Sequence, residues 1–408
     1  MPIEPSIALN DAVFHLVAGL LGLAAIGVTA WRPARNWSLV LFGLWLGIIA
    51  MAAAKLSQQD FEAVRLLAIG LFVYLPVMLL ASAGLLRGWR RWFALGGALV
   101  LLLIAGDAFL VEPTWLAVER YTVVSPKIER PLKIVLLADI QTDRVGQYER
   151  SVLMQAAAER PDLLLLGGDY LQSRSDKLPA LRAELQEAWR AANFHPPLGV
   201  YAVRGNVDRA DWAATFEEMG IVAVDRTESF ELPQLRLTCL GHPYSFQTQL
   251  QVGGGDPARF HIVLGHSPNF ALGRIDGDLL LAGHTHGGQV RVPFWGPPIT
   301  HTLVPRHWAA GRTELPGGGT LIVSRGIGME RGAAPRMRFF CRPELTVIEL
   351  VPAPASPPAA GSRQVADRVA RPSPPKLRMV PLRDVPRDTY GSSAEQLGGA
   401  AAAAGGTG

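Results

Sequence analysis

The first 111 residues contain four long apolar runs, at positions 12–30, 36–54, 66–86 and 92–111. Each run is 19–21 residues long, close to the ~20 residues that a helix needs to cross the hydrocarbon core of a bilayer. Four such runs in succession leave almost no polar face, so buried helices of a large globular protein are the weaker interpretation. We therefore predict an α-helical membrane domain with four spans over residues 1–112.

The charges of the short loops predict the orientation of these spans. The loops at 31–35 and 87–91 carry five arginines, whereas the loop at 55–65 carries only Lys55 and Arg65. Loops rich in Lys and Arg tend to stay in the cytoplasm, and an even number of spans returns the chain to its starting side. We expect a multi-pass protein of the cell (inner) membrane whose residues after 112 lie outside the cytoplasm.

From about residue 118 the apolar runs become short and end in Gly, Asp, Asn or His. Those that predict buried strands are 133–139, 162–169, 199–206, 261–266 and 278–284. Helical patterns separate the first of them, near 147–159, 178–192 and 209–219. This alternation is typical of crossover units and a largely parallel sheet. Further strands are predicted at 221–225, 235–241, 319–324 and 345–350, completing a second sheet.

Composition excludes several classes of protein. Charged residues make up only 18% of the chain and the net charge is +4, without a dense basic patch, so nucleic-acid binding is not expected. Two cysteines cannot build a disulfide scaffold. Residues 352–408 are rich in Pro, Ala and Gly and show no apolar periodicity, which predicts a disordered tail.

Polar side chains stand at the end of five predicted strands. They are Asp139, Asp169, Asn206, His266 and His284, and His286 follows two residues later. Open α/β sheets place ligands outside the carboxyl ends of their strands, and Asp, Asn and His are all metal ligands. Each residue alone has a simpler explanation as a turn or a hydrogen-bonded polar group. Their joint occurrence, ending in Gly283-His284-Thr285-His286, predicts a metal site.

The same residues carry a family resemblance. Asp139-Ile-Gln141, Gly168-Asp169, Gly205-Asn206-Val207-Asp208, Gly265-His266 and Gly283-His284-Thr-His286 resemble the motifs of the calcineurin-like metallophosphoesterases. The stretches at 283–296 and 324–350 resemble the membrane-associated bacterial branch of the YaeI/YkuE type. The resemblance covers roughly 118–351. It implies a four-layer α/β sandwich, here expected over 113–351, and hydrolysis of a phosphoester by a metal-activated hydroxide.

Carried over residue by residue, the resemblance implies two divalent metal ions bridged by Asp169. One ion would also bind Asp139 and His286, and the other Asn206, His266 and His284. Gln141 stands where the family normally has a histidine ligand, but its amide oxygen can still coordinate. Because this exchange makes the ligand set harder, we expect Mn²⁺ or Mg²⁺ to be favoured, with iron or zinc as alternatives.

A second departure is Val207, which replaces the catalytic histidine of the family pattern. A phosphate or aryl oxide leaving group needs no such acid, so the sequence predicts a phosphodiesterase or pyrophosphatase. Asp169 and Asn206 are the expected catalytic residues, with Arg204 as a phosphate contact and His242 as a substitute acid or substrate contact. Asp208, which would orient the missing ring, is expected to pair with Arg204 or Arg209.

The expected partners are a phosphorylated small molecule or lipid and the membrane lipid itself. The membrane domain is the motive for the leading hypothesis, hydrolysis of a lipid head group or lipid-linked diphosphate. A soluble nucleotide or cyclic phosphodiester is the rival substrate class. A different interpretation is a degenerate sensor or structural membrane protein, in which Gln141 and Val207 mark lost catalysis while metal binding survives.

Overall fold

The computed structural model of the chain describes residues 5–31, 43, 45, 47–48 and 60–354. The chain divides into two compact units, Met1–Pro352 and Ala353–Gly408, and the first is described below. The predicted span at 36–54 lies outside the described residues except at four positions. The predicted disordered tail lies almost entirely outside them. Both stay predictions.

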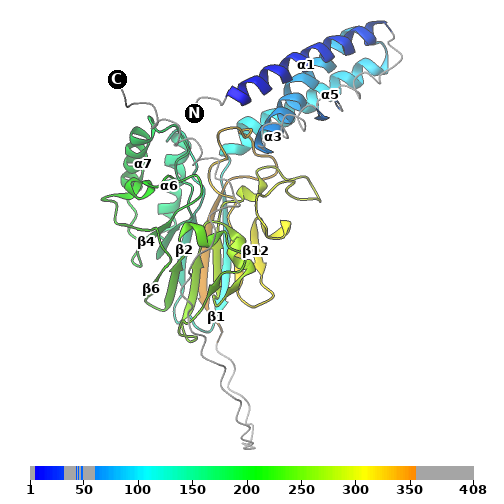
Figure 1. The fold of residues 1–408 in the computed structure, drawn as a ribbon. Helices are drawn as coiled ribbons and strands as arrows, with labels where there is room; N and C mark the ends of the chain where they lie inside the picture. Colours follow the sequence, from blue (N-terminus) through cyan, green and yellow to red (C-terminus); the bar gives the residue numbers. More distant parts are fainter. Residues whose placement is uncertain (1–4, 32–42, 44, 46, 49–59, 355–408) are drawn as a thin grey trace, which may run out of the picture. The chain divides into compact units, whose positions relative to one another are not determined.

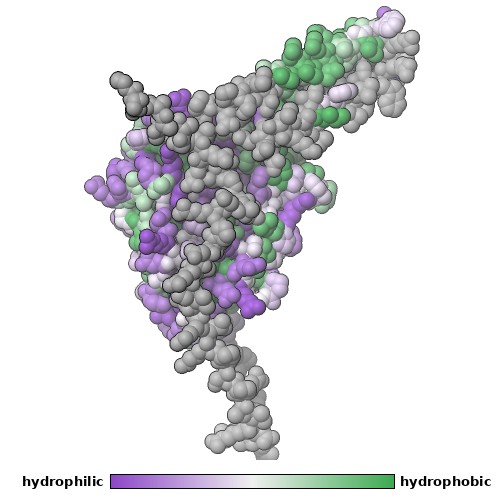
Figure 2. Space-filling model, in the orientation of Figure 1, coloured by the Kyte–Doolittle hydropathy of each residue, from purple (hydrophilic) through white to green (hydrophobic). Residues whose placement is uncertain are grey.

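Three helical stretches of the described residues are long and apolar enough to cross a membrane: Asp11–Trp31, Phe61–Leu85 and Trp89–Thr114. They agree with three of the four predicted spans. The elements that form them are α1 (Pro5–Trp31), α3 (Asp60–Ile69), the π-helix η1 (Gly70–Tyr74), α4 (Leu75–Leu85), α5 (Trp89–Gly106), the π-helix η2 (Asp107–Val111) and the short η3 (Glu112–Thr114). Their described surfaces are mostly apolar (Figure 2).

Contacts between the helices define which helix ends lie together. The Arg65 guanidinium pairs with the Asp11 carboxylate at 2.5 Å, so α1 and α3 begin at the same end of the bundle. Phe14 and Leu66 are buried in one cluster close to those ends. Since α4 and α5 are joined by a short turn at residues 86–88, the start of α3 and the end of η3 also share that end. The catalytic domain begins there.

Two six-stranded sheets form the rest of the unit (Figure 1). In spatial order, the first sheet contains β1 (Ala117–Ser125), β14 (Glu344–Pro352), β2 (Leu132–Leu137), β3 (Leu163–Leu166), β4 (Val200–Val203) and β5 (Ile221–Val224). The second contains β12 (Gly311–Glu314), β13 (Thr320–Val323), β11 (Leu279–Ala282), β9 (Phe260–Leu264), β7 (Leu235–Cys239) and β6 (Glu228–Leu232). A third, minor sheet pairs β8 (Gln251–Val252) with β10 (Arg274–Ile275). The central strands of both large sheets run parallel.

Alternating side chains of the central strands enter different cores, which explains their unbroken apolar runs. Ile134 and Leu136 of β2 point into the core between the two sheets. Val135 and Leu137 point to the opposite side, where α6 (Gln147–Ala158) and α7 (Leu178–Ala192) cover the first sheet. The outer face of the second sheet packs against short 3₁₀ segments and loops. In each of the two large sheets, the carboxyl ends of buried parallel strands therefore lie at one edge of the sheet.

Two sequence expectations about these elements are wrong. The strands predicted at 221–225 and 345–350 join the first sheet as β5 and β14, not the second. Hydropathy identifies a buried strand but does not encode its hydrogen-bonding neighbour. The helix predicted at 209–219 is only the 3₁₀ segment η4, Trp212–Phe216. This segment buries the side chains of a single turn. Gly220, four residues after its end, has a φ angle of 68°.

A buried arginine ties together the loops that follow β13. Arg338 is fully buried, and its guanidinium donates to the backbone carbonyls of Arg325, Gly326, Gly328 and Cys341. No carboxylate pairs with it among these contacts, so the side chain acts as a shared donor for four backbone carbonyls, of which that of Gly326 also accepts the Glu344 N–H. Burial lowers the pKa of Arg338, yet the group remains a cation beside the predicted metal site.

We expect Arg338→Ala to destabilise the catalytic domain by at least ~3 kcal/mol, because each buried carbonyl that loses its donor costs ~1–3 kcal/mol. Thermal unfolding of the detergent-solubilised protein measures the loss. Arg174→Ala is the matched control, since Arg174 is about half exposed and, within the described part of the chain, forms an ion pair with Asp176 alone. Equal melting temperatures for the two variants would show that this shared donor contributes no stability.

Candidate metal centre

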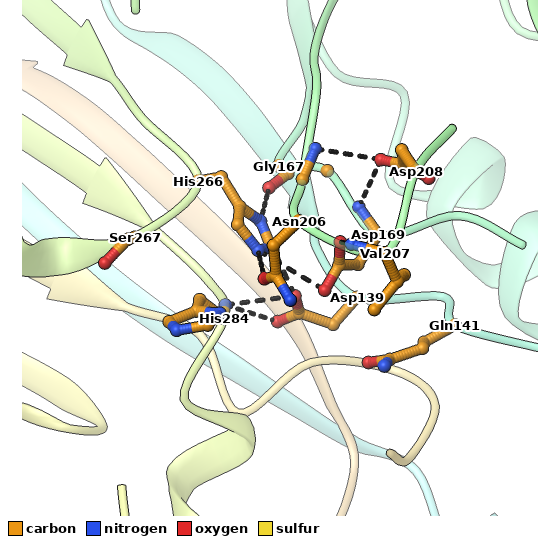
Figure 3. A network of polar contacts seen from close by, with 12 residues as sticks. Asp139, Gln141, Gly167, Asp169, Asn206, Val207, Asp208, His266, Ser267 and His284 are labelled. Carbon is orange, nitrogen blue, oxygen red and sulfur yellow. Dashed lines mark hydrogen bonds and ion pairs between the residues drawn. The ribbon is translucent and has the colours of Figure 1, made fainter. Parts of the chain in front are cut away.

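The side chains predicted to bind metal come from the ends of strands in both sheets. Asp139, Asp169 and Asn206 follow β2, β3 and β4 of the first sheet within three residues. His266 and His284 each stand two residues beyond β9 and β11 of the second sheet. Figure 3 shows these five side chains pointing toward one another. The convergence expected from the sequence is therefore present, and it depends on two facing sheets.

His266 lies at the middle of the cluster. Its Nε2 atom is 3.0 Å from the Asn206 Oδ1 atom and 3.3 Å from the Asp169 Oδ2 atom. Its Nδ1 atom lies 2.8 Å from the backbone oxygen of Gly167. One ligand atom each from Asp169, His266 and His284 lie within 4.8 Å of one another. This is a spacing that a single divalent cation can bridge.

The hydrogen bonds of His266 show that the cluster fits a cation. A carbonyl oxygen only accepts hydrogen bonds, so Nδ1 must carry a proton. In a neutral ring the Nε2 atom then carries a lone pair that faces two acceptor oxygens. This arrangement is favourable only if a proton or a metal ion lies between Nε2 and these oxygens. A histidine that donates its other N–H to a backbone carbonyl is the usual arrangement of a metal ligand.

Two more buried acceptor atoms have no hydrogen-bond partner among the described residues. They are the Gln141 Oε1 atom and the His286 Nδ1 atom, and both belong to residues predicted to hold the first metal ion. Burying an unpaired polar atom costs ~1–3 kcal/mol, and a bound metal ion would offset this cost at each of the two atoms. With Asp139 and Asp169 they make a donor set of three oxygen-bearing groups and one nitrogen.

The backbone at the predicted ligands is held in an uncommon conformation. Positive φ angles, between 34° and 69°, occur at Asp139, Gln141, Asp169, His284 and His286. Non-glycine residues rarely adopt this conformation, and each costs ~1–3 kcal/mol. The tight turns need glycine beside them: a Cβ atom on Gly205 would lie 2.0 Å from the Asp169 Oδ1 atom. These strained backbone conformations direct the predicted ligand side chains toward the same site.

The buried groups of the cluster perturb one another electrostatically. Burial raises the pKa of Asp139 to about 7. Burial would also raise the pKa of Asp169, but the positive charge and hydrogen bond of His266 lower it to about 2. Burial opposes protonation of His266, yet the Asp169 carboxylate raises the pKa of His266 to about 9. The single imidazolium does not neutralise both carboxyl groups, which is the charge imbalance that divalent cations correct.

Asp208 has a different role from the pairing expected for it. Its Oδ2 atom accepts from the backbone N–H groups of Asp169 and Gly205, at 2.7 and 2.9 Å, and its Oδ1 atom accepts from that of Tyr170 at 2.8 Å. Arg204 donates to the Asp208 backbone carbonyl, not to its carboxylate. The Asp208 side chain thus joins the loops after β3 and β4, and so positions the Asp169 carboxylate.

Gln141 is held by two residues that sequence reasoning missed. The Gln141 amide nitrogen donates to the Gln172 Oε1 atom and to the Glu330 Oε2 atom, both at 2.9 Å. Gln172 in turn donates to the Glu330 Oε1 atom at 2.8 Å. Both hydrogens of the Gln141 amide are therefore used, which leaves its oxygen as the free end. Glu330 stands seven residues after the end of β13, too far for the strand-end pattern that pointed to the other site residues.

Arg204 and His242, the two further catalytic candidates, stand at the edge of this cluster. The Arg204 Nε and Nη2 atoms donate to the Asp208 carbonyl at 3.0 and 2.9 Å, which fixes the side chain within its loop. The His242 ring lies 5.1 Å from the ring of Phe246, which also contacts His266 and His284. Burial lowers the pKa of His242 to about 4, so its imidazole is neutral at pH 7.

Comparisons with known proteins agree with this site. The calcineurin-like phosphoesterase family profile matches residues 132–288. Phosphodiesterase YaeI of Escherichia coli is 29% identical over 284 residues, which cover 64% of this chain and 99% of that protein. The uncharacterized metallophosphoesterase YkuE of Bacillus subtilis is 28% identical and covers 60% of this chain and 89% of that protein. The UDP-2,3-diacylglucosamine pyrophosphatase LpxG of Chlamydia muridarum is 22% identical, with coverages of 53% and 83%.

The matched range begins at β2 and ends just after His286, so it contains all seven residues predicted to bind metal. Two of the relatives are named as a phosphodiesterase and a pyrophosphatase. The resemblance noted in the sequence is confirmed. Residues 132–288 of this chain therefore form a calcineurin-like phosphoesterase domain, similar to that of a phosphodiesterase and of a pyrophosphatase.

Proposed function

We propose that this protein is a membrane-anchored phosphodiesterase or pyrophosphatase that acts on a lipid head group or a lipid-linked diphosphate. The observation that carries the proposal is the convergence of buried acceptor atoms around His266 at the ends of strands from both sheets. Asp139, Gln141, Asp169 and His286 would hold one divalent ion. Asp169, Asn206, His266 and His284 would hold the second.

The metal ions would supply an activated water and neutralise the charge that develops on the phosphoryl oxygens. The chain's own residues prepare the site for them. The Asp208 carboxylate accepts the backbone N–H of Asp169 at 2.7 Å, and the Val207 N–H donates to the Asp169 Oδ1 atom at 2.9 Å, so the amide and one carboxylate oxygen of Asp169 are fixed. The His284 imidazole is neutral, since burial lowers its pKa to about 3, and it is ready to coordinate.

Val207 cannot protonate a leaving group, which favours substrates whose leaving group departs as a stable anion. A positioned general acid contributes ~10²–10⁴ in rate, equal to ~2.7–5.4 kcal/mol at ~1.36 kcal/mol per tenfold. Valine has no proton to give, and the neutral His242 is a substrate contact in this proposal. Phosphate and aryl oxide leave as anions near neutral pH, so a pyrophosphate or aryl phosphodiester bond suits this site better than an alkyl monoester.

The membrane helices and a relative named for a diacylated nucleotide sugar support a lipid substrate. The proposal includes the fourth span at 36–54, the four-layer arrangement of the catalytic domain and a multi-pass position in the inner membrane. It places the catalytic domain outside the cytoplasm, on the grounds of the arginine-rich loops. Reporter fusions at the C-terminus test this orientation.

A catalytically degenerate sensor is the second candidate. It is favoured by the hydrogen bonds of Gln141, which tie this predicted ligand to Gln172 and Glu330, and by the missing acid at Val207. A sensor of this kind binds the metal ions but does not turn over any phosphodiester. Metal content measured together with turnover separates it from the enzyme.

We expect Asp169→Asn to lower Mn²⁺-dependent hydrolysis of a bis-aryl phosphodiester by at least ~10²-fold, the scale on which single groups of a preorganised electrostatic site act. The variant loses the charge that both metal ions share. Asp176→Asn is the control, because Asp176 is an exposed carboxylate in the loop after the same strand. Full activity in Asp169→Asn would contradict the proposed centre, and metal binding without turnover in the native protein would favour the sensor.

After metal removal, we expect Mn²⁺ or Mg²⁺ to restore more activity than Zn²⁺, because the Gln141 oxygen is a harder ligand than imidazole nitrogen. Gln141→His should raise the ratio of zinc- to manganese-supported turnover. Gln155→His, on the exposed face of α6, should leave that ratio unaltered. Zinc performing as well as manganese in the native protein would count against a ligand role for the Gln141 oxygen.

Bis-aryl phosphodiesters and nucleotide sugars should be cleaved much faster than glycerol phosphate, because only the alkyl ester needs a protonated leaving oxygen. Val207→His should improve alkyl ester turnover by up to ~10²-fold, the lower range for a general acid. Steady-state rates on the three substrates measure both effects. A native preference for glycerol phosphate would refute the leaving-group argument.

A further inference from the structure

The loop between β11 and β12 exposes an unusual number of large apolar side chains. We call residues 290–303 the apical loop. Its exposed apolar residues are Val292, Phe294, Trp295, Ile299 and Leu303. Phe294 is as exposed as in an unfolded chain, at 111%. Exposed apolar residues gathered in this way mark interaction surfaces in soluble domains, so the apical loop needs a partner.

The backbone of the apical loop forms a tight turn that exposes its aromatic residues. Val292 and Gly296 exchange two hydrogen bonds of 2.9 Å, which places Pro293, Phe294 and Trp295 at the tip of a tight turn. Phe294 has a φ of 66°, a conformation that bulky residues rarely adopt. The Arg306 guanidinium lies over the Trp295 ring at 4.2 Å. Strain and exposure are therefore combined in one phenylalanine, and neither benefits the isolated domain.

Both ends of the apical loop contact the membrane helices. Val290 packs in one cluster with Phe72 and Phe109 of the π-helical segments. The ring of His301 lies 4.4 Å from the ring of Phe61, the first residue of the second described span. Phe61 and Thr114 stand at the same end of the helical bundle. The loop is thus fastened at the level where the apolar spans end.

The same loop also reaches the metal centre. The His284 imidazole forms a hydrogen bond with the backbone of His301, and His284 is one of the clustered groups around His266. Asn269 accepts a hydrogen bond from the Leu303 N–H at 2.8 Å, which holds the far end of the loop to the catalytic domain. A single segment therefore connects an apolar surface, a span terminus and a proposed metal ligand.

The position of the spans decides which partner fits this surface. Leu110, Val111 and Trp115 are also exposed, at the end of the third described span. Aromatic side chains favour the interface between hydrocarbon and water, where Trp is enriched at both faces of a bilayer. A bilayer crossed by these helices has its surface at this level, so lipid is the partner already in reach. The green surface of the helices in Figure 2 marks that bilayer-facing part.

We infer that the apical loop inserts Phe294 and Trp295 into the interfacial layer of the membrane and forms the edge along which a lipid's phosphorylated head group enters the metal centre. The insertion follows from the exposed tip and its contacts with the span ends. The head-group entry rests on the proposed function. The two claims can therefore fail separately.

A fluorescence experiment on the full chain tests the insertion. Phe294→Cys carries an environment-sensitive nitrobenzoxadiazole label in nanodiscs of phosphatidylethanolamine and phosphatidylglycerol. Cys239 and Cys341 are buried, so the introduced thiol is the reactive one. We expect a blue-shifted emission that nitroxide groups on the lipid acyl chains quench. Val222→Cys, exposed on the edge strand β5, is the control and should show neither effect.

An aqueous emission from the label at position 294, quenched by iodide and not by the nitroxide lipids, would overturn the inference. A blue shift that nitroxide lipids do not quench would also overturn it, because a second copy or another protein would then cover the loop. Neither result depends on activity, so the phosphoesterase proposal is untouched by them.

Activity measurements test the entry of the head group. In Phe294→Ser/Trp295→Ser, the ratio of lipid pyrophosphate turnover in vesicles to bis-aryl phosphodiester turnover should fall about tenfold or more, because both aromatic side chains that would enter the interfacial layer are lost. Val222→Ser should keep the native ratio. An unaltered ratio together with confirmed insertion would leave the loop as an anchor and reject its part in substrate entry.

Discussion

The structure depends on the electrostatic conflict among buried acceptor atoms around His266. The Nε2 atom of this ring lies between the Asn206 amide oxygen and the Asp169 carboxylate, and its Nδ1 atom is 3.8 Å from the Asp139 carboxylate, so two buried carboxyl groups share one imidazolium. In the interior of a protein such an arrangement is expensive unless a cation lies at its centre. The strained turns, the close glycines and the Asp208 side chain all serve to hold these groups together against their repulsion.

The structure gives a physical explanation of how Gln141 and Val207, the two departures from the family pattern, fit into the site. Gln141 keeps its oxygen free because Gln172 and Glu330 occupy both amide hydrogens, so the histidine of the pattern has been replaced by a supported group and not by a void. Val207 contributes only its backbone N–H, which holds Asp169. In the proposed function the site would hold cations without this proton donor, a combination that favours substrates with stable leaving anions.

The catalytic domain and the membrane helices are joined by specific polar contacts as well as apolar ones. The Glu112 carboxylate at the end of η3 accepts the backbone N–H groups of Phe340 and Cys341, and Arg338 N–H donates to the Ala108 carbonyl. Arg338 then reaches the carbonyls of the loop that lies behind Asp139. A short chain of residues therefore links the end of the third described span to the loop beside Asp139.

The sequence by itself determined the apolar spans, the buried strands and the residues that stand at strand ends, because hydropathy and the choice of Asp, Asn and His are local properties. It also identified Gln141 and Val207 as departures. Only the tertiary structure decided that the strand ends come from two facing sheets, that β5 and β14 join the first, and that Asp208 binds backbone amides. Gln172, Glu330 and Arg338 lay beyond sequence reasoning, since their roles arise from hydrogen bonds that join distant segments, such as Gln141 and Glu330, which are 189 residues apart, and no local pattern encodes such pairs.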